Sequence, residues 1–308
     1  MHKYILKRLL MIIPVLLGVL FIMFTLSALT PGDPALIILG DGATPEGIAR
    51  VREELRLDDP FLIRFFSYLW DAVRLNFGNS YATQRPVFQE ISARFPNTIQ
   101  LAGMGITFGL LMGIPLGILS ATKQYSIFDV GATFIGLLGV SIPNFWLGLL
   151  LIMLFTVNLG WLPPTGFATP QQWIMPTIAI GTGSAALMMR MTRSSMLECI
   201  RQDYIRTARA KGQKEGVVIF RHALRNALIP VTTSAGLSFG FLLGGAILTE
   251  TIFAIPGLGS FMVTAFNGRD WPVAIGGVML SAIAFSFVNL LVDILYAFLD
   301  PRIRSQYS

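Results

Sequence analysis

The chain has 308 residues, of which 54% are hydrophobic and 13% are charged, and its formal net charge is +6. A soluble domain carries about 25% charged residues, so this composition excludes an ordinary soluble protein and indicates one embedded in a lipid bilayer. The positive charges lie in blocks between apolar runs, a distribution that excludes nucleic-acid binding and is typical of membrane topology. The single cysteine, Cys199, excludes an intrachain disulfide, and two histidines leave no metal-ligand cluster.

The sequence predicts an all-α, polytopic membrane protein with six transmembrane helices. Each predicted span is long enough to cross a hydrocarbon core of about 30 Å. The spans cover residues 9–30, 98–121, 130–160, 172–192, 227–250 and 273–298. Residues 1–8 precede the first span, which is too long for the apolar part of a signal peptide and therefore reads as an uncleaved helix. The third span contains Pro143, which predicts a kink or, alternatively, two short segments.

Two loops are long. The first loop, residues 31–98, is slightly acidic and has amphipathic stretches over residues 48–57 and 62–75. Its aromatic residues predict a small folded element rather than a linker. These aromatic residues are Phe61, Phe65, Phe66, Tyr68, Trp70 and Phe77. The second long loop, residues 193–226, is basic, and we call it the basic loop.

Lysine and arginine set the predicted orientation. With the N-terminus inside, the inner segments hold fifteen of them, nine between Arg190 and Arg225. The outside holds Arg269 and the seven arginines of the first loop, which is too long to count in the positive-inside rule. Both termini are therefore expected in the cytoplasm, with the first loop outside.

Two common catalytic motifs are absent from the sequence. It contains no Gly-x-x-x-x-Gly-Lys-Ser/Thr phosphate loop and no His-Glu-x-x-His pair. Asp293 is the one carboxylate clearly inside a span, and Glu250 lies at the edge of another. We therefore expect a chain that is not an enzyme, that holds no cofactor and that does not hydrolyse nucleotide through a phosphate loop.

Small residues recur every fourth position in two spans and predict close helix packing, with sliding of helices during switching as the alternative. These residues are Gly105, Gly109, Gly113 and Gly117 in the second span and Gly236, Gly240 and Gly244 in the fifth. Four polar residues within spans are candidates for a solute path: Ser141, Asn144, Asn289 and Asp293. For Asp293 the alternative is an ion pair with an arginine near the inner end, and for Ser141 and Asn144 it is hydrogen bonding to backbone freed at Pro143.

The basic loop predicts a short helix pair. Met196, Ile200, Tyr204 and Ala208 share one helical face, Gly212 permits a sharp break, and a second helical stretch runs through Val217, Val218 and Phe220. Such a pair suits the groove of a cytoplasmic partner, or else an interfacial helix attracted to anionic lipid.

Residues 190–198, 203–212 and 222–230 resemble the cytoplasmic loop of the dipeptide/oligopeptide/nickel class of ABC-transporter permeases, and most closely that of the B-type permease of dipeptide importers. The similarity extends to residues 31–34, to 249–253 with 256–259, and to 293–296 with 300–304, so it covers essentially the whole chain. It implies a type I ABC-importer permease in which residues 9–308 form one transmembrane domain.

The resemblance also implies roles for residues and partners. Coupling to the ATPase falls on Tyr204, Arg206, Thr207, Ala208, Arg209, Ala210, Lys211 and Gly212. Two departures from the generic motif are Arg206, where that motif has glutamate, and a long interval from Gly212 to Pro230. The expected partners are a homologous second permease, two cytoplasmic subunits that bind ATP and Mg²⁺, an extracytoplasmic substrate-binding protein and the lipid bilayer of a prokaryotic cell membrane.

The expected function is therefore ATP-driven import of short peptides by alternating access, with this chain as half of the pore. Glutathione or nickel complexes are alternative solutes for the same machinery. An ion-coupled carrier is a further alternative, against which the scarcity of ionisable residues in the spans counts. The last alternative is a membrane enzyme or an assembly factor. The first loop is expected to touch the binding protein or cap the pore, or else only to pack.

Overall fold

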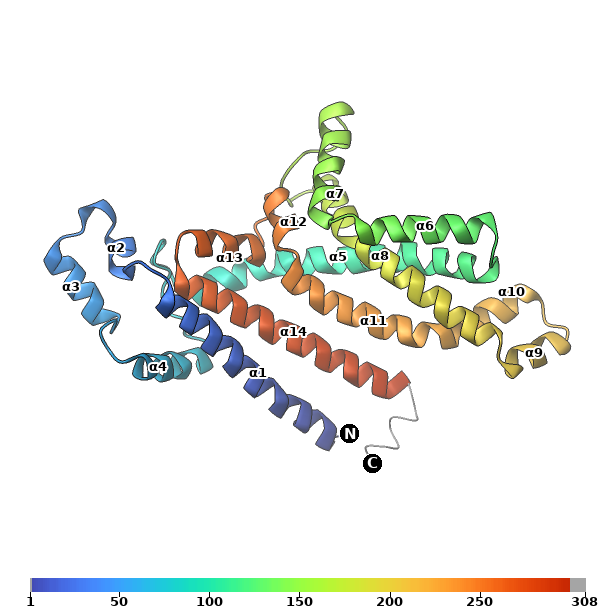
Figure 1. Cartoon of the computed structure of the whole chain (residues 1–308), viewed down its shortest axis with the longest axis horizontal. Coiled ribbons are helices and arrows are strands. Elements are labelled where there is room, and N and C mark those ends of the chain that lie inside the picture. The colour runs from blue at the N-terminus through green and yellow to red at the C-terminus, as the bar shows by residue number, and fades with distance from the viewer. Residues whose placement is uncertain (1, 300–308) are drawn as a thin grey trace.

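Long helices run side by side in a bundle, with the first loop at one end and the basic loop at the other (Figure 1). A computed structural model of the chain describes residues 2–299. The elements are α1 (His2–Leu29), α2 (Pro34–Leu39), η1 (Gly40–Gly42), α3 (Pro45–Glu54), α4 (Phe61–Val73), α5 (Val87–Thr122), α6 (Ile127–Ser141), α7 (Asn144–Leu151), η2 (Ile152–Asn158), α8 (Pro170–Ile200), α9 (Asp203–Ala210), α10 (Glu215–Val217), η3 (Val218–Ala223), α11 (Leu224–Gly245), α12 (Ile247–Ile252), α13 (Leu258–Asn267) and α14 (Trp271–Leu299).

Four helical segments in the described residues are both long and apolar enough to cross a membrane: Leu6–Leu29, Val87–Thr122, Glu215–Gly244 and Trp271–Leu295. The bent pair formed by α6 and the α7–η2 segment makes a fifth if it is counted as one crossing. α8 has 31 residues but falls outside this set, because glycine, threonine, serine and arginine reduce its apolar character. The all-helical class is thus confirmed, and the structure supports four or five of the six predicted crossings.

The third predicted span is broken rather than gently kinked. α6 ends at Ser141, Ile142 is extended, and Pro143 caps α7, which leaves α6 at an angle of 101°. Proline disfavours helical backbone in the residue before it, so Ile142 is where the helix must end. Figure 1 shows α7 standing away from the bundle.

The first loop is folded into α2, α3 and α4, and it ends earlier than expected. α5 begins at Val87 rather than at residue 98, because Pro86 is a favourable helix start and the residues that follow it remain helical. Phe65 and Phe77 are buried against α1 and α14, whereas Phe66 and Trp70 are each 61% exposed. The aromatic residues thus divide between a core and a surface.

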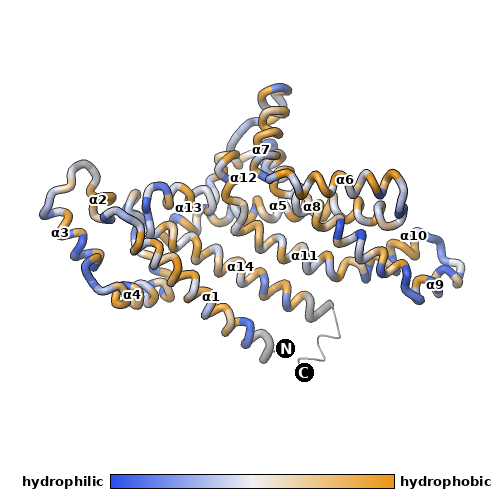
Figure 2. The backbone as a smooth tube through the Cα atoms, viewed as in Figure 1, coloured by the Kyte–Doolittle hydropathy of each residue, from blue (hydrophilic) through white to orange (hydrophobic). Residues whose placement is uncertain are grey.

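α8 lies at the centre of the bundle, and its neighbours are α5, α11, α6 and α7. The outer helices α1, α6 and α14 carry hydrophobic residues along most of their length, and hydrophilic residues gather around α3 and α9 (Figure 2). A bilayer around the long helices is consistent with this pattern, because lipid-facing side chains are apolar. Residues 300–304, which belong to the resemblance stated above, lie outside the described part of the chain.

Candidate functional site

The basic loop folds as two short helical pieces that project from the end of the bundle. α8 continues to Ile200, Gln202 has extended backbone, and α9 starts at Asp203. After the turn at Gly212 the chain re-enters helix at Glu215 and continues through η3 into α11. Gly212 has φ +72°, a left-handed conformation that costs a residue with a side chain about 1 kcal/mol.

A small apolar core holds the basic loop against the bundle. Its central members are Met196, Ile205, Ala208, Val218 and Ala223, all buried. The predicted face is correct at Met196 and Ala208 but wrong at Tyr204, which is 41% exposed. The break at Gln202 rotates α9 relative to α8, so Ile205 takes the buried place that an unbroken helix would give to Tyr204.

Most residues predicted for coupling are exposed on the basic loop. Tyr204, Arg206, Thr207, Arg209, Ala210, Lys211 and Gly212 are exposed, and Ala208 alone is buried. Arg209 reaches across the turn and donates to both carboxylate oxygens of Glu215, at 3.0 and 2.6 Å. This contact raises the pKa of Arg209 above its ordinary value. The ion pair closes the turn at Gly212, so the loop has a defined shape.

A buried ion pair holds the beginning of the basic loop, where α8 enters it. Arg193 of α8 donates from Nε and Nη2 to the two carboxylate oxygens of Asp129 on α6, at 2.9 and 3.0 Å. Ser120 of α5 donates to the same carboxylate and accepts from Arg193 Nε at 2.9 Å. The backbone N–H of Tyr125 donates to Asp129 at 3.0 Å. The ends of α5, α6 and α8 are therefore joined at one carboxylate, which no sequence pattern indicated.

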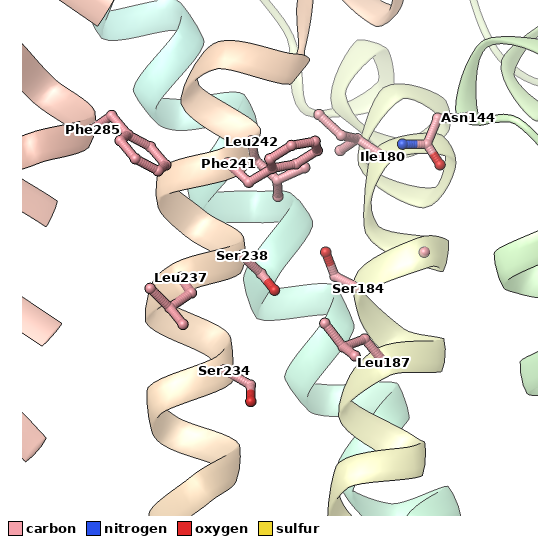
Figure 3. Close-up of a pocket in the computed structure, with 11 residues that line it drawn as sticks. Asn144, Ile180, Ser184, Leu187, Ser234, Leu237, Ser238, Phe241, Leu242 and Phe285 are labelled. Atoms are coloured by element: carbon pink, nitrogen blue, oxygen red, sulfur yellow. The ribbon is translucent and has the colours of Figure 1, made fainter. Parts of the chain in front are cut away.

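A cavity of about 530 Å³ lies further from the basic loop along α8. It is lined by α8 and α11, with contributions from α7 and α14. Its polar lining consists of Asn144, Ser184, Ser234 and Ser238, without a charged side chain, and its apolar lining includes Phe241 and Phe285. Figure 3 shows the hydroxyls of Ser184 and Ser238 pointing into the space between the two helices. Such a surface offers hydrogen bonds from several directions to a polar solute.

The four residues predicted for a solute path do not come together. Asn144 lines the cavity just described, and Ser141 donates to the backbone oxygen of Leu137 at 2.8 Å. Asn289 and Asp293 line a separate cavity of about 210 Å³, where Asp293 lies 3.1 Å from Arg8 of α1. Asn289 Oδ1 is buried without a hydrogen-bond partner in the described residues. The cavity serines were missed because a serine on a helix carries no motif.

The glycines of α5 contact α8 directly. An added Cβ would lie 2.7 Å from Ile180 at Gly105, 2.8 Å from Ser184 at Gly109, 2.5 Å from the backbone oxygen of Ala185 at Gly113, and 2.6 Å from Thr192 at Gly117. The two helices are thus in backbone contact over about three turns.

The glycines of α11 face a different helix. A Cβ at Gly236 or Gly240 would meet Val292 or Phe285 of α14, whereas nothing lies within 4 Å of one at Gly244. Gly244 therefore lies outside this contact.

Buried carboxylates also shape the opposite end. Glu250 accepts from the Thr98 hydroxyl at 2.6 Å and from the Ser260 backbone N–H at 2.8 Å, at the start of α13. An added Cβ at Gly257 or Gly259 would lie 2.3 or 2.8 Å from its nearest neighbour, so the segment fits closely around this carboxylate. Asp270 holds the first loop by accepting from Ser80 and from the Tyr81 backbone.

Comparison with known proteins gives two matching family models. "Binding-protein-dependent transport system inner membrane component" matches residues 113–305, and the N-terminal model of the same kind of component matches residues 1–102. Among curated relatives, the dipeptide transport system permease protein DppB of Alkalihalophilus pseudofirmus is 44% identical, covering 99% of this chain and 100% of its own. The glutathione transport system permease protein GsiC of Salmonella typhi is 44% identical, covering 99% of both chains.

The fold has solved counterparts. A chain of the inward-facing methionine ABC transporter MetNI matches with a TM-score of 0.58 and 21% identity, over 68% of this chain and 96% of its own. A chain of an amino acid ABC transporter matches with a TM-score of 0.52 and 14% identity, over 70% of this chain and 94% of its own.

Proposed function

The chain belongs to the family of inner membrane components of binding-protein-dependent transport systems, and from this premise we propose that it forms half of the pore of an ATP-driven importer of short peptides. The observation that carries the proposal is the pairing of an uncharged polar cavity between α8 and α11 with a folded, projecting loop at the end of the same α8. One helix thus joins a solute-sized space to a surface that a partner can move.

We assign coupling to the exposed side of the basic loop, from Tyr204 to Gly212. Two cytoplasmic ATPase subunits bind ATP and Mg²⁺ in this scheme, and one receives the α9 helix in a groove. Arg193 and Asp129 then carry the displacement into α5 and α6, because the ion pair joins the ends of these helices. ATP hydrolysis takes place in the ATPase subunits, and this chain transmits their movement and forms part of the solute path.

The proposed topology has six crossings, with α8 and the bent α6–α7–η2 segment counted beside the four long apolar segments. Both termini and the basic loop lie in the cytoplasm, following the distribution of arginine and lysine. The first loop, held by Asp270, faces outward, where it contacts a substrate-binding protein. A homologous second permease supplies the other half of a type I importer pore.

Alternating access follows from these parts. Closure of the ATPases on ATP moves the basic loop, and the cavity between α8 and α11 opens toward the loaded binding protein. Hydrolysis returns the pore to an inward-open state. The close backbone contact of α5 with α8 makes these two helices move together.

Short peptides are the proposed solute because relatives named as peptide and dipeptide permeases match over nearly the whole chain. The cavity volume and its neutral polar lining suit a small zwitterionic solute. Glutathione is the second candidate, since permeases named for it are equally similar. A nickel complex, like an ion-coupled carrier mechanism, has no observation in its favour among the described residues.

Transport by the reconstituted complex tests the proposal. This permease is incorporated into liposomes with its second permease and ATPases, and uptake of a labelled dipeptide is measured with the loaded binding protein. We expect uptake that requires ATP and stops when the ATPase carries a substitution that blocks hydrolysis. Uptake that persists without ATP, or follows an imposed ion gradient, would refute an ATP-driven importer.

A further inference from the structure

One face of α8 continues from the polar cavity down to the basic loop. Residues spaced three and four apart lie on the same side of a helix. Gly183 and Leu187 line the polar cavity, and the same spacing leads on to Arg190, Ser194 and Arg201. The last three line a second cavity of about 460 Å³ nearer the loop. Both cavities therefore include residues of one stripe on α8, the first cavity against α11 and the second against Thr133 of α6.

The second cavity is cationic, in contrast to the neutral first one. It contains Arg190, Arg193 and Arg201, with Glu198 as its one acidic residue. Asp129 already neutralises Arg193. Arg190 and Arg201 are exposed, and their guanidinium groups have no ion-pair or hydrogen-bond partner among residues 2–299. Glu198 lies in no ion pair there either. Two unpaired guanidinium groups thus stand on the face that leads away from the polar cavity.

We propose that this face is the inner part of the solute path and that Arg190 is a binding point for the carboxylate group of the transported solute, with Arg201 as the next point. The inference rests on the proposed function and adds a chemical class to it, a solute that carries a free carboxylate. A planar guanidinium binds a carboxylate through two parallel hydrogen bonds, and the Ser194 hydroxyl one turn further offers a third.

The spacing fixes how the two arginines act. Arg201 lies eleven positions after Arg190, which is about 16 Å along a helix. A dipeptide in extended form spans about 7 Å, so one carboxylate meets the two arginines in succession. Arg190 lies about 9 Å from Ser184 along the helix, close enough for a solute leaving the polar cavity to reach it.

Exposed guanidinium groups suit a release path. A carboxylate bound at a partly hydrated site gains a moderate free energy, so it can leave again. The positive face also favours an anionic group over a cationic one along the way. A neutral face would give no such preference.

Four versions of the full complex test the inference: wild type, Arg190→Gln, Arg190→Lys and Arg221→Gln. Arg221 is an exposed arginine of η3 and is the matched control, because it lies off this helix face. We expect Arg190→Gln to reduce ATP-driven uptake of labelled alanyl-alanine by about tenfold, the loss expected for one charge-assisted hydrogen bond. Arg190→Lys keeps the charge but loses the two parallel hydrogen bonds, so its uptake should lie between those of wild type and Arg190→Gln. Arg221→Gln should stay within about twofold of wild type.

Three outcomes would overturn the inference. The first is uptake by Arg190→Gln equal to wild type. The second is loss of the ATPase stimulation by the loaded binding protein, which would make Arg190 a contact for the ATPase. The third is a defect that disappears in liposomes of phosphatidylcholine alone, which would assign the arginine to the phosphate of an anionic lipid. If wild type itself shows no ATP-driven uptake, the proposed function fails first.

Photolabelling gives a second measurement if Arg190→Gln does not assemble. Wild-type complex is irradiated with alanyl-benzoylphenylalanine and digested, and the labelled residues are identified by mass spectrometry. Adducts between residues 183 and 201 of α8 are expected. Adducts confined to other segments would contradict a path along this face.

Discussion

Arg193 and Asp129 form a two-pronged ion pair, with Nε and Nη2 at 2.9 and 3.0 Å from the two carboxylate oxygens. The Asp129 side chain is 6% exposed and that of Arg193 is 30% exposed, so the pair is held largely away from water. Because these residues are 64 positions apart, the pair fixes α6 relative to the root of the basic loop.

Asp129→Asn should therefore destabilise the protein. The arginine keeps its charge but loses its counter-charge, which costs about 2 kcal/mol at a partly buried site. Thermal unfolding of the purified complex in detergent measures the loss. Glu54→Gln is the control, since Glu54 and Arg50 form an exposed pair at 3.2 Å whose removal should change stability by less than about 0.5 kcal/mol. Equal effects of the two variants would contradict the anchoring role of Asp129.

Gly113→Ala tests the contact of α5 with α8. The new methyl group would lie 2.5 Å from the backbone oxygen of Ala185, so the helices must separate, at a cost of about 1–3 kcal/mol. Gly103→Ala is the matched control on the same helix, because nothing lies within 4 Å of an added Cβ there. This control should be neutral or slightly stabilising, since alanine favours helix by about 1 kcal/mol over glycine. Comparable losses in both variants would argue against a close contact.

Comparing Gly212→Ala with Gly212→Asn tests whether the left-handed backbone conformation of the turn matters for coupling. No atom would touch a new Cβ, so the effect of alanine comes from φ +72° alone. We expect Gly212→Ala to lower ATP-driven uptake and Gly212→Asn to retain more of it, because asparagine tolerates left-handed backbone better. ATP hydrolysis and uptake are measured on the same reconstituted samples. Equal uptake by the two variants would show that the turn conformation does not matter for coupling.

Glu250→Ala should destabilise the end that carries α12 and α13. The Thr98 hydroxyl and the Ser260 backbone N–H would lose their acceptor, which costs about 2 kcal/mol in a buried site. Glu46→Ala removes an exposed carboxylate from the first turn of α3 and serves as control, with a change of about 0.5 kcal/mol. Limited proteolysis of residues 246–268 is a local readout, and unchanged cleavage in Glu250→Ala would contradict this account.

Alkaline pH should loosen the first loop through Tyr81. Burial raises the pKa of Tyr81 to about 12, from about 10 in an unfolded chain. A raised pKa means that the folded state holds the proton more tightly, so the stabilisation is complete below pH of about 10 and is lost as pH rises toward 12. The unfolding temperature should therefore fall between pH of about 9 and about 11, and this fall should be smaller in Tyr81→Phe than in wild type. An identical fall in both proteins would exclude this group.

Local patterns predicted much of this molecule, and contacts between distant residues account for what they missed. The four-residue glycine spacing on α5 identified a ridge, and Pro143 identified the place where the third predicted span changes direction, because both are properties of a single segment. The buried face of α9 was misassigned, since an extended Gln202 changes the helical phase and no residue there demands it.

The site shows the same limit. The exposed coupling residues came from a resemblance carried by one continuous loop. The Asp129–Arg193 pair and the serines of the cavity depend on how α6, α8 and α11 meet, which sequence spacing does not encode.

We expect the break at Pro143 to set an order of events during biosynthesis. Gly148 of α7 packs against Ala179 and Phe253, which emerge from the ribosome some 30 and 100 residues later. Until then the segment has no partner to hold it at 101° to α6. The α6–α7–η2 segment should enter the bilayer as one continuous hydrophobic stretch, and α7 should take up its angle to α6 afterwards. A cysteine placed at Val157 would then change its accessibility to a water-soluble reagent once the nascent chain passes α12, a rearrangement of an already inserted segment.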